Sequence, residues 1–280
     1  MSDDMSWTSL PLTYEPPEID TSVPHSARVY DYVLGGKDNY PVDREAAEQM
    51  LSGWPGLQIS MRENRKFMHR AVRYLAEQGI DQFLDIGTGI PTSPNLHEIV
   101  QGVNPRSHIV YADNDPIVLA HAGAKLNSTR EGRISYLHAD MNDPEAILSA
   151  PELTDTLDFS RPVALSIIAV LQFVIDDEKA YDLVRRYLRP LAAGSYLALS
   201  TVTTDSSPAP IGGVVAEYTK RGMPARNRTL AEVRPFFDGL ELVDPEVVLV
   251  HKWRPEPLAG KERKIKDSDI AMYGGVALKR

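Results

Sequence analysis

Residues 82–94, QFLDIGTGIPTSP, join a short apolar run to an acid, a Gly-x-Gly turn and a Ser-Pro pair. A run of this length and composition predicts a buried strand over residues 82–86. Glycines directly after a strand let the main chain come close to a ligand, because they have no Cβ. The stretch therefore predicts a strand that ends in a ligand-binding loop.

The chain from residue 82 onward alternates apolar runs with helix signals. Further strands are expected at residues 108–112, 134–138, 162–170 and 195–202, and a long helix at residues 176–194. A capping side chain before a proline predicts three more helix starts, at Ser93-Pro94, Asp115-Pro116 and Asp143-Pro144. This alternation predicts a doubly wound, mostly parallel α/β sheet with right-handed crossovers.

The end of the chain departs from this alternation. Residues 245–253, PEVVLVHKW, and residues 273–280, YGGVALKR, predict two closing strands with a charged loop between them. Without a long helix between them, two strands favour an antiparallel hairpin at the edge of the sheet. Such an end is unusual for a dinucleotide-binding fold.

The residues before the sheet predict a flexible segment at 1–22 and three helices. We expect Ser26 to cap the first helix, Gly35 and Gly36 to end it, and Asp43 to cap the second. The third covers residues 62–79 and carries an apolar stripe of Phe67, Met68, Ala71, Val72 and Leu75. Its Arg and Lys residues are interpreted as a solvated face rather than as a nucleic-acid site.

The glycine turn is compared with three kinds of nucleotide site. A dinucleotide loop needs a third glycine and an immediate helix, whereas this chain has Thr92 and a late helix start at Pro94. A phosphate-binding P-loop is excluded because no Gly-Lys-Ser/Thr follows. S-adenosylmethionine has no phosphates and needs instead a close main chain and acids at successive strand ends.

Three strand ends carry suitable groups in the required order. Asp85 can reach the ligand's ammonium, Asp113 can accept both ribose hydroxyls, and Asp140 can accept the adenine amine. Met141 offers packing and a main-chain N–H beside Asp140. This order of groups is much more specific than the glycines alone.

These residues carry a family resemblance. FLDIGTGIP, VYADNDP and HADM resemble the successive cofactor motifs of class I S-adenosylmethionine-dependent methyltransferases. SARVYDYVLGGKDNYPVDR, NRKFMHRAVRYL and FLDIGTGIPT resemble an actinobacterial family of S-adenosyl methyltransferases, formerly a domain of unknown function. The resemblance implies S-adenosyl-L-methionine as cofactor, bound by Asp85, Gly87, Thr88, Gly89, Asp113, Asn114, Asp140 and Met141.

The resemblance also implies the fold of the chain and its division into a lid and a cofactor-binding sheet. We expect a Rossmann-like class I methyltransferase fold, with a mostly parallel seven-stranded sheet, a C-terminal antiparallel hairpin and an N-terminal helical lid. A single domain would cover residues 23–280, with the lid at 23–80 and the cofactor-binding sheet at 81–280.

Residues 29–44, VYDYVLGGKDNYPVDR, allow two interpretations. They form either a capped helix and turn with Tyr30 and Val33 buried, or a lid over the cofactor and part of the acceptor pocket. A general base is needed only if the acceptor must lose a proton, and the candidates are His25, Asp38 and Tyr40.

The composition excludes several chemistries. The 280 residues include no cysteine, which excludes disulfides, thiolate zinc sites and a thiolate attack on cytosine. His138 and Asp140 have no third partner at metal-binding spacing, so no metal is expected. Residues 167–173, IIAVLQF, lack the Asn/Asp-Pro-Pro-aromatic pattern of enzymes that methylate the amines of DNA bases.

The net charge and the hydropathy of the chain limit the classes of partner that it is expected to bind. The net charge of −9 argues against a general affinity for nucleic acid, and the net-basic residues 252–266 are interpreted as a solvated loop. The acidic N-terminus has no signal-peptide pattern, and the longest apolar run is too short for a membrane. We therefore expect a cytoplasmic protein that binds neither nucleic acid nor membrane, and a homodimer is a candidate assembly.

The sequence thus predicts an S-adenosylmethionine-dependent methyltransferase, with a small-molecule acceptor favoured by elimination. A cofactor-binding protein without transferase activity, in a regulatory or scaffold role, is the alternative. A dinucleotide oxidoreductase is disfavoured by the loop, and a nucleic-acid or protein acceptor stays open.

Overall fold

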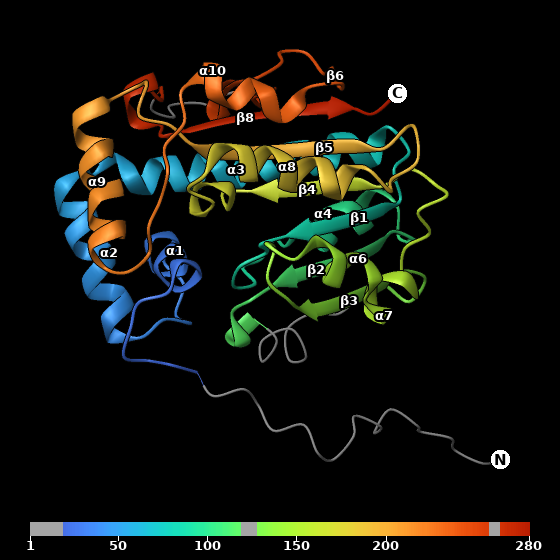
Figure 1. Cartoon of the computed structure of the whole chain (residues 1–280), viewed down its shortest axis with the longest axis horizontal. Coiled ribbons are helices and arrows are strands. Elements are labelled where there is room, and N and C mark those ends of the chain that lie inside the picture. Colours follow the sequence, from blue (N-terminus) through green and yellow to red (C-terminus); the bar gives the residue numbers. More distant parts are fainter. Residues whose placement is uncertain (1–18, 119–127, 258–263) are drawn as a thin grey trace.

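The computed structural model describes residues 19–118, 128–257 and 264–280 (Figure 1). Its centre is one sheet with the strand order β3-β2-β1-β4-β5-β8-β6, in which β7 also pairs with β8. The parallel strands are β1 (Gln82–Ile86), β2 (His108–Asp113), β3 (Arg133–His138), β4 (Ala164–Ile168) and β5 (Tyr196–Val202). The antiparallel strands are β6 (Glu241–Leu242), β7 (Val248–Leu249) and β8 (Met272–Leu278). The predicted fold class is confirmed.

Helices cover both faces of the sheet because the central strands are apolar on both sides. Leu84 and Ile86 of β1 pack into one cluster, and Phe83 packs into the other. The first cluster includes α6 (Pro144–Ser149), α7 (Pro151–Thr154), α8 (Asp177–Leu188), α10 (Leu230–Val233) and η2 (Arg234–Phe237). The second includes α3 (Gly56–Glu77) and α4 (Leu96–Val103). The shorter elements are η1 (Leu171–Phe173), η3 (Val250–Lys252) and η4 (Asp267–Asp269).

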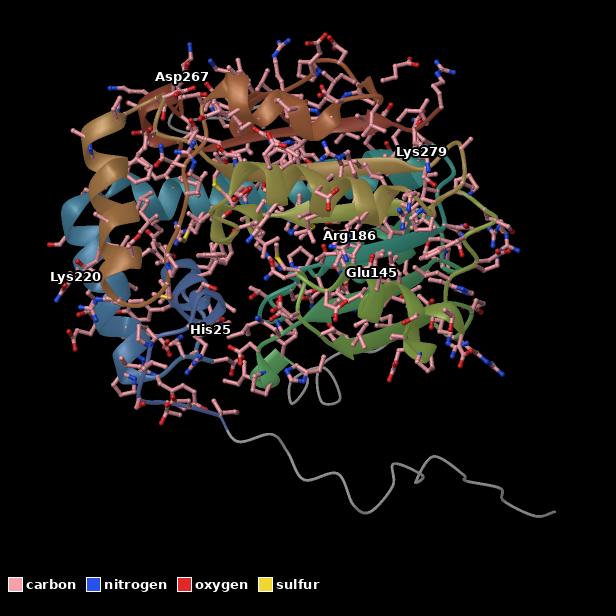
Figure 2. All side chains as sticks on the ribbon, viewed as in Figure 1. His25, Glu145, Arg186, Lys220, Asp267 and Lys279 are labelled. Carbon is pink, nitrogen blue, oxygen red and sulfur yellow. The ribbon has the colours of Figure 1, made fainter. Side chains whose placement is uncertain are left out.

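Charged side chains fasten the helices of the first face to their surroundings. Arg186 of α8 forms an ion pair with Glu145 of α6, and Figure 2 labels both residues on the outer surface. Lys279, just after β8, donates through Nζ to the carbonyl oxygens of Leu188 and Leu191 at 2.8 and 2.6 Å. The C-terminal carbonyls of α8 are thereby satisfied by a cation.

The closing edge has the antiparallel arrangement that was expected, but its outer strand is broken. β6 pairs with one end of β8 and β7 with the other, so the eight strands occupy seven positions. A continuous strand over residues 245–253 is wrong, because only Val248–Leu249 of this segment is strand and Val250–Lys252 forms η3. Arg70 of α3 donates to the carbonyl oxygens of Trp253 and Val250 at 2.8 and 2.7 Å, which turns this segment away from strand pairing.

Besides the start of α3, at Gly56 rather than at residue 62, three helix starts differ from the predicted ones. His25, not Ser26, is the N-cap of α1 (Ser26–Leu34). Tyr40, not Asp43, is the N-cap of α2 (Pro41–Gly53), and Asp43 lies inside the helix and accepts from the N–H of Tyr40 at 2.9 Å. Pro41 explains this shift, because proline is favoured at the first position of a helix.

The third difference concerns the helix after the glycine turn. Ser93-Pro94 is a cis peptide that precedes the helix, and Asn95 caps α4 together with Glu98. Asp143 caps α6 as predicted, through a 3.1 Å bond from the N–H of Ala146. Asp115 accepts from the N–H of Ile117 at 3.0 Å, and the rest of its predicted helix lies outside the described residues.

A helical cap lies beyond the carboxyl ends of the parallel strands, at the left of Figure 1. It consists of α1, α2, the start of α3 and α9 (Pro208–Lys220), which share one apolar cluster. The second half of α3, from Phe67 onward, instead covers the sheet, so this helix joins the two parts. The sequence did not assign α9 to the cap. Within the described residues, no helix is both long and apolar enough to span a bilayer.

The contact of Arg70 predicts a specific loss of stability. Arg70→Met should lower the free energy of unfolding by about 2–4 kcal/mol, because two buried carbonyl groups lose their donors. Urea denaturation measures the change. Arg73→Met, an exposed position on the same helix, is the control and should change stability by less than about 0.5 kcal/mol. Equal midpoints for the two variants would contradict the role given to Arg70.

Candidate functional site

A cavity of about 270 Å³ lies between the carboxyl ends of the strands and the helical cap. Its floor comes from the loops after β1, β2, β3 and β4, and its cover comes from α1, α3 and α9. The carboxyl ends of parallel strands are where ligands bind in such sheets. All eight predicted cofactor residues line this cavity, namely Asp85, Gly87, Thr88, Gly89, Asp113, Asn114, Asp140 and Met141.

The glycine turn is fixed by the neighbouring strand. The N–H groups of Gly87 and Thr88 donate to the carbonyl oxygen of Ala112 at 2.8 and 3.4 Å. Gly87 and Gly89 have φ angles of 70° and 69°, in the left-handed region that favours glycine. A Cβ on Gly87 would lie 2.6 Å from Cγ2 of Val170, whereas a Cβ on Gly89 would meet nothing within 4 Å. Packing thus requires Gly87, and Gly89 leaves open space for a ligand.

Asp85 is a buried acid at the start of this turn. It is 8 % exposed, and burial raises its pKa to about 6. Hydrogen bonds from the hydroxyls of Ser166 and Thr88 lower this pKa. The charge of Asp113 raises the pKa further, and the charge of Arg65 lowers it. An ionised carboxylate in this position lacks the solvation that water would give it. A ligand ammonium would compensate for that loss.

Asp113 lies at the end of β2, where both of its carboxylate oxygens are held by the main chain. Oδ2 accepts from the N–H of Gly89 at 2.7 Å, and Oδ1 accepts from the N–H of Asp115 at 2.9 Å. Burial raises the pKa of Asp113, and these two N–H groups oppose the rise. Each oxygen keeps a further lone pair, so the carboxylate can accept two adjacent hydroxyls.

The loop after β3 is more open. Asp140 is exposed, and its Oδ1 accepts from the N–H and the amide of Asn142 at 2.9 and 2.8 Å. The carbonyl oxygen of Met141 accepts from the hydroxyl of Tyr187 at 2.9 Å. His138 Nε2 lies 3.0 Å from the carbonyl oxygen of Asn114 and so joins two of the loops. Among the residues that the structure describes, no three potential metal ligands are grouped.

Only one of the three proposed bases lies on the cavity wall. His25, which Figure 2 labels, lines the cavity, and its Nδ1 lies 2.9 Å from Oδ2 of Asp115 and 3.3 Å from the main-chain nitrogen of Ala27. Asp38 and Tyr40 are not among the lining residues. The ring of Tyr40 instead lies 5.4 Å from the guanidinium of Arg28.

The glycine-rich segment before α2 is organised around Asp31, which lines the cavity. Oδ2 of this buried carboxylate accepts from the N–H of Asp38 at 3.0 Å and from the amide of Asn39 at 2.8 Å. A Cβ on Gly36 would lie 1.9 Å from Oδ1 of Asp31, so no other residue fits there. The residues that follow α1 form a tight turn, and residues of α1 line the cavity. Each of the two interpretations of residues 29–44 therefore describes part of this segment.

Two buried acids tie α1 to its neighbours. Nε of Arg28 lies 3.5 Å from Oδ2 of Asp115, and Nη1 lies 3.7 Å from Oδ2 of Asp43. His25 completes the group through its contact with Asp115. We call these four residues the latch. The latch joins α1 and α2 to the loop that also carries Asp113.

Arg65 is a wall residue that the sequence analysis missed. The prediction that the basic residues of the third helix form a solvated face is wrong for this residue, which donates to the carbonyl oxygens of Thr92 and Pro94. Burial lowers the pKa of its guanidinium. Its spacing of about one turn from Met61 and Met68, both buried, was the available signal.

A family model described as S-adenosyl methyltransferase matches residues 13–280. The chain belongs to this family. It is therefore an S-adenosylmethionine-dependent methyltransferase, and the predicted family, activity and cofactor are confirmed. No protein of curated function matches the sequence.

Solved structures agree with the family. A DUF574 family protein from Streptomyces avermitilis is 57% identical, covers 94% of this chain and 100% of its own, and superposes with a TM-score of 0.91. A candidate methyltransferase from Thermobifida fusca is 38% identical over 96% of this chain and 99% of its own, with a TM-score of 0.85. Magnesium protoporphyrin IX methyltransferase from Synechocystis, 11% identical over 90% of this chain and 93% of its own, shares the fold with a TM-score of 0.51.

The raised pKa of Asp85 predicts opposite effects on stability and binding. In the folded protein, protonated Asp85 contributes stability below its ordinary pKa of 3.8, and this contribution is lost as pH rises through about 6. Asp85→Asn should therefore raise the free energy of unfolding by about 1–3 kcal/mol at pH 7.5 and by little at pH 4. Denaturant titrations at the two pH values measure the difference.

The same variant should lose affinity for S-adenosylhomocysteine, whose ammonium no longer meets a charge. In the wild type, this affinity should fall by about tenfold per pH unit below pH 6, as Asp85 takes up a proton. An Asp85→Asn protein that is no more stable at pH 7.5, or that binds the ligand as the wild type does, would contradict this role.

Proposed function

We propose that this methyltransferase modifies a small molecule that binds inside the cavity, between the strand ends and the helical cap. The observation that carries the proposal is the position of the cavity under α1, α3 and α9. A covered cavity admits a compact ligand more readily than a folded nucleic acid or protein surface. The net charge of −9 also argues against a nucleic-acid acceptor.

The cofactor residues fit S-adenosylmethionine in two respects. The open space at Gly89 accommodates the approach of a ligand to the main chain, and Asp85 offers a poorly solvated carboxylate to an ammonium. We assign the ribose hydroxyls to Asp113, the adenine amine to Asp140 and the adenine ring to Met141. Thr88 and Asn114 complete the wall around these groups.

Arg65 supplies a positive charge to the same end of the cavity. It lies close enough to Asp85 to lower the pKa of that acid, and both residues line the cavity. An amino acid group carries one positive and one negative charge, so the pair can hold both ends of it. We therefore propose that Arg65 binds the carboxylate of the cofactor.

When bound, the cofactor would supply a methyl group on a sulfonium, and an acceptor lone pair would attack the methyl carbon while the electron pair of the broken C–S bond stays on sulfur. The residues of the cap align the acceptor and exclude water, which can account for several kcal/mol of the barrier. His25 is the one of our three candidate bases that is on the wall, and it can receive a proton if the acceptor releases one. We also propose a cytoplasmic location and an actinobacterial source, the latter supported by the Streptomyces and Thermobifida relatives.

Substitution of Asp113 tests the cofactor assignment. Asp113→Asn should weaken the binding of S-adenosylhomocysteine by about 100-fold in titration calorimetry, because two charge-assisted hydrogen bonds are lost or weakened. Asp140→Ala, which removes an exposed carboxylate, should weaken it by no more than about tenfold. An unchanged dissociation constant for Asp113→Asn, or binding of NAD by the wild type, would overturn the assignment.

The acceptor class has its own test. With methyl-labelled S-adenosylmethionine and a bacterial extract, the wild-type protein should transfer label to a low-mass compound other than S-adenosylmethionine, and not to RNA, DNA or protein. Asp113→Asn is the control and should add little label beyond that of the extract alone. Label in a macromolecular fraction that depends on the wild-type protein would refute a small-molecule acceptor.

A further inference from the structure

The cap end of the cavity differs in chemistry from the cofactor end. Its wall includes six apolar side chains that form or contact one cluster, and we call this part the apolar chamber: Trp54, Leu57, Met61, Phe173, Ile211 and Val214. The ring of Phe173 lies 6.1 Å from that of Tyr218, another wall residue. Such a surface favours an aromatic or aliphatic ligand, because both partners leave water on binding.

The charged residues of the cavity wall are engaged elsewhere. Asp85 and Asp113 lie at the ends of β1 and β2, Asp140 follows β3, and Arg65 of α3 binds the loop after β1, so these four residues lie at the cofactor end, while the ring of His25 contacts Asp115 of the latch. Asp31 lies in the cap, but its carboxylate is used by the turn that contains Asp38 and Asn39. A charged acceptor would therefore enter the apolar chamber without a counter-ion, which is costly in a buried site.

Three polar side chains near the apolar chamber, those of Tyr30, Asn64 and Ser60, are satisfied within the protein. The hydroxyl of Tyr30 donates to the carbonyl oxygen of Met61 at 3.1 Å and accepts from the amide of Asn64 at 3.3 Å. Oδ1 of Asn64 accepts from the hydroxyl of Ser200 at 2.7 Å. Oγ of Ser60 accepts from the N–H of Ala271 at 2.8 Å. These groups hold the cap on the sheet and offer little to a ligand.

Gln172 is the exception. Its Nε2 donates to the carbonyl oxygen of Ala169 at 2.5 Å, which fixes the orientation of the amide, while its Oε1 is buried without a hydrogen-bond partner. Gln172 lines the cavity and is 7 % exposed. Among the cavity-lining residues that the structure describes, it alone has such an unpartnered buried side-chain atom.

Gln172 also lies where the two ends of the cavity meet. It follows β4 directly after Val170, which packs on Gly87 of the cofactor loop, and it precedes Phe173 of the apolar chamber. Its main-chain carbonyl oxygen accepts from the N–H of Arg226 at 2.7 Å, and Ala169 holds a φ angle of 54°. Backbone strain of this kind persists where the surroundings impose it, often at ligand sites.

We propose that the apolar chamber binds an uncharged, largely apolar acceptor, aromatic or aliphatic, that carries one O–H or N–H donor, and that Oε1 of Gln172 accepts this hydrogen. The assignment rests on the proposed function, because it takes the same cavity as the acceptor site. An amide oxygen accepts a hydrogen bond without needing a charge. Gln172 is therefore an acceptor-binding residue, and it selects for a neutral donor over an anion.

Three probes of similar size test the chemistry of the apolar chamber. They are p-cresol, which has a hydroxyl donor, 4-fluorotoluene, which has none, and p-toluate, which is an anion. Saturation-transfer NMR with wild-type protein saturated with S-adenosylhomocysteine should rank p-cresol first, about tenfold above 4-fluorotoluene, because one hydrogen bond to a buried acceptor is worth about that factor. p-Toluate should bind more weakly than either. This comparison does not depend on the folding of any variant.

Gln172→Met removes the acceptor oxygen at nearly constant volume. The variant should bind p-cresol and 4-fluorotoluene equally and keep its affinity for S-adenosylhomocysteine within about twofold. Gln58→Met is the matched control: Gln58 donates to the carbonyl oxygen of Val33 in the cap and does not line the cavity. It should keep the preference for p-cresol.

Several results would overturn the inference while leaving the cofactor assignment standing. They are equal binding of p-cresol and 4-fluorotoluene by the wild type, preferential binding of p-toluate, an unchanged preference in Gln172→Met, and no binding of any probe. Loss of S-adenosylhomocysteine binding by the wild type would instead refute the proposed function. Calorimetry with that ligand separates the two failures.

Discussion

The cavity depends on the latch, in which two buried acids, Asp43 and Asp115, meet Arg28 and His25 of α1. Asp115 also donates its N–H to Asp113, so the same loop positions the cap and the acid assigned to ribose. Buried ion pairs add little net stability, since desolvation offsets much of their attraction, but they penalise any arrangement that separates the partners. The latch therefore fixes where the cap lies rather than how tightly it is held.

A second connection runs through α3, whose two ends belong to different apolar clusters. Its arginines do not face solvent throughout, because Arg65 binds carbonyl groups of the loop before α4 and Arg70 binds carbonyl groups after β7. A guanidinium can donate several hydrogen bonds to main-chain carbonyls that no strand partner reaches. One helix thus braces the cap, the cofactor loop and the closing edge of the sheet.

The sequence predicted the parallel strands well because their apolar runs are local signals that the sheet leaves intact. It misplaced the caps at Ser26, Asp43 and Ser93, because several side chains nearby can cap a helix and distant partners decide among them. Asp43, for example, also accepts from the N–H of His25 at 2.9 Å. The motif around Asp38 and Tyr40 identified the right segment, but Asp31 faces the cavity. Helix α9 could not be assigned there, since its contacts span distant parts of the chain, and the signal for Arg65 was only its spacing from Met61 and Met68.

The cavity contains two buried polar groups whose interactions are incomplete within the protein. At the cofactor end, burial raises the pKa of Asp85, because its charged carboxylate loses solvation there. Where this end meets the apolar chamber, Oε1 of Gln172 is buried without a donor. Each defect destabilises the free protein, and under the proposed assignments a cation would relieve it at Asp85 and a neutral donor at Gln172. A site built this way gives up folding stability for selectivity, because a ligand that lacks the matching group leaves the defect in place.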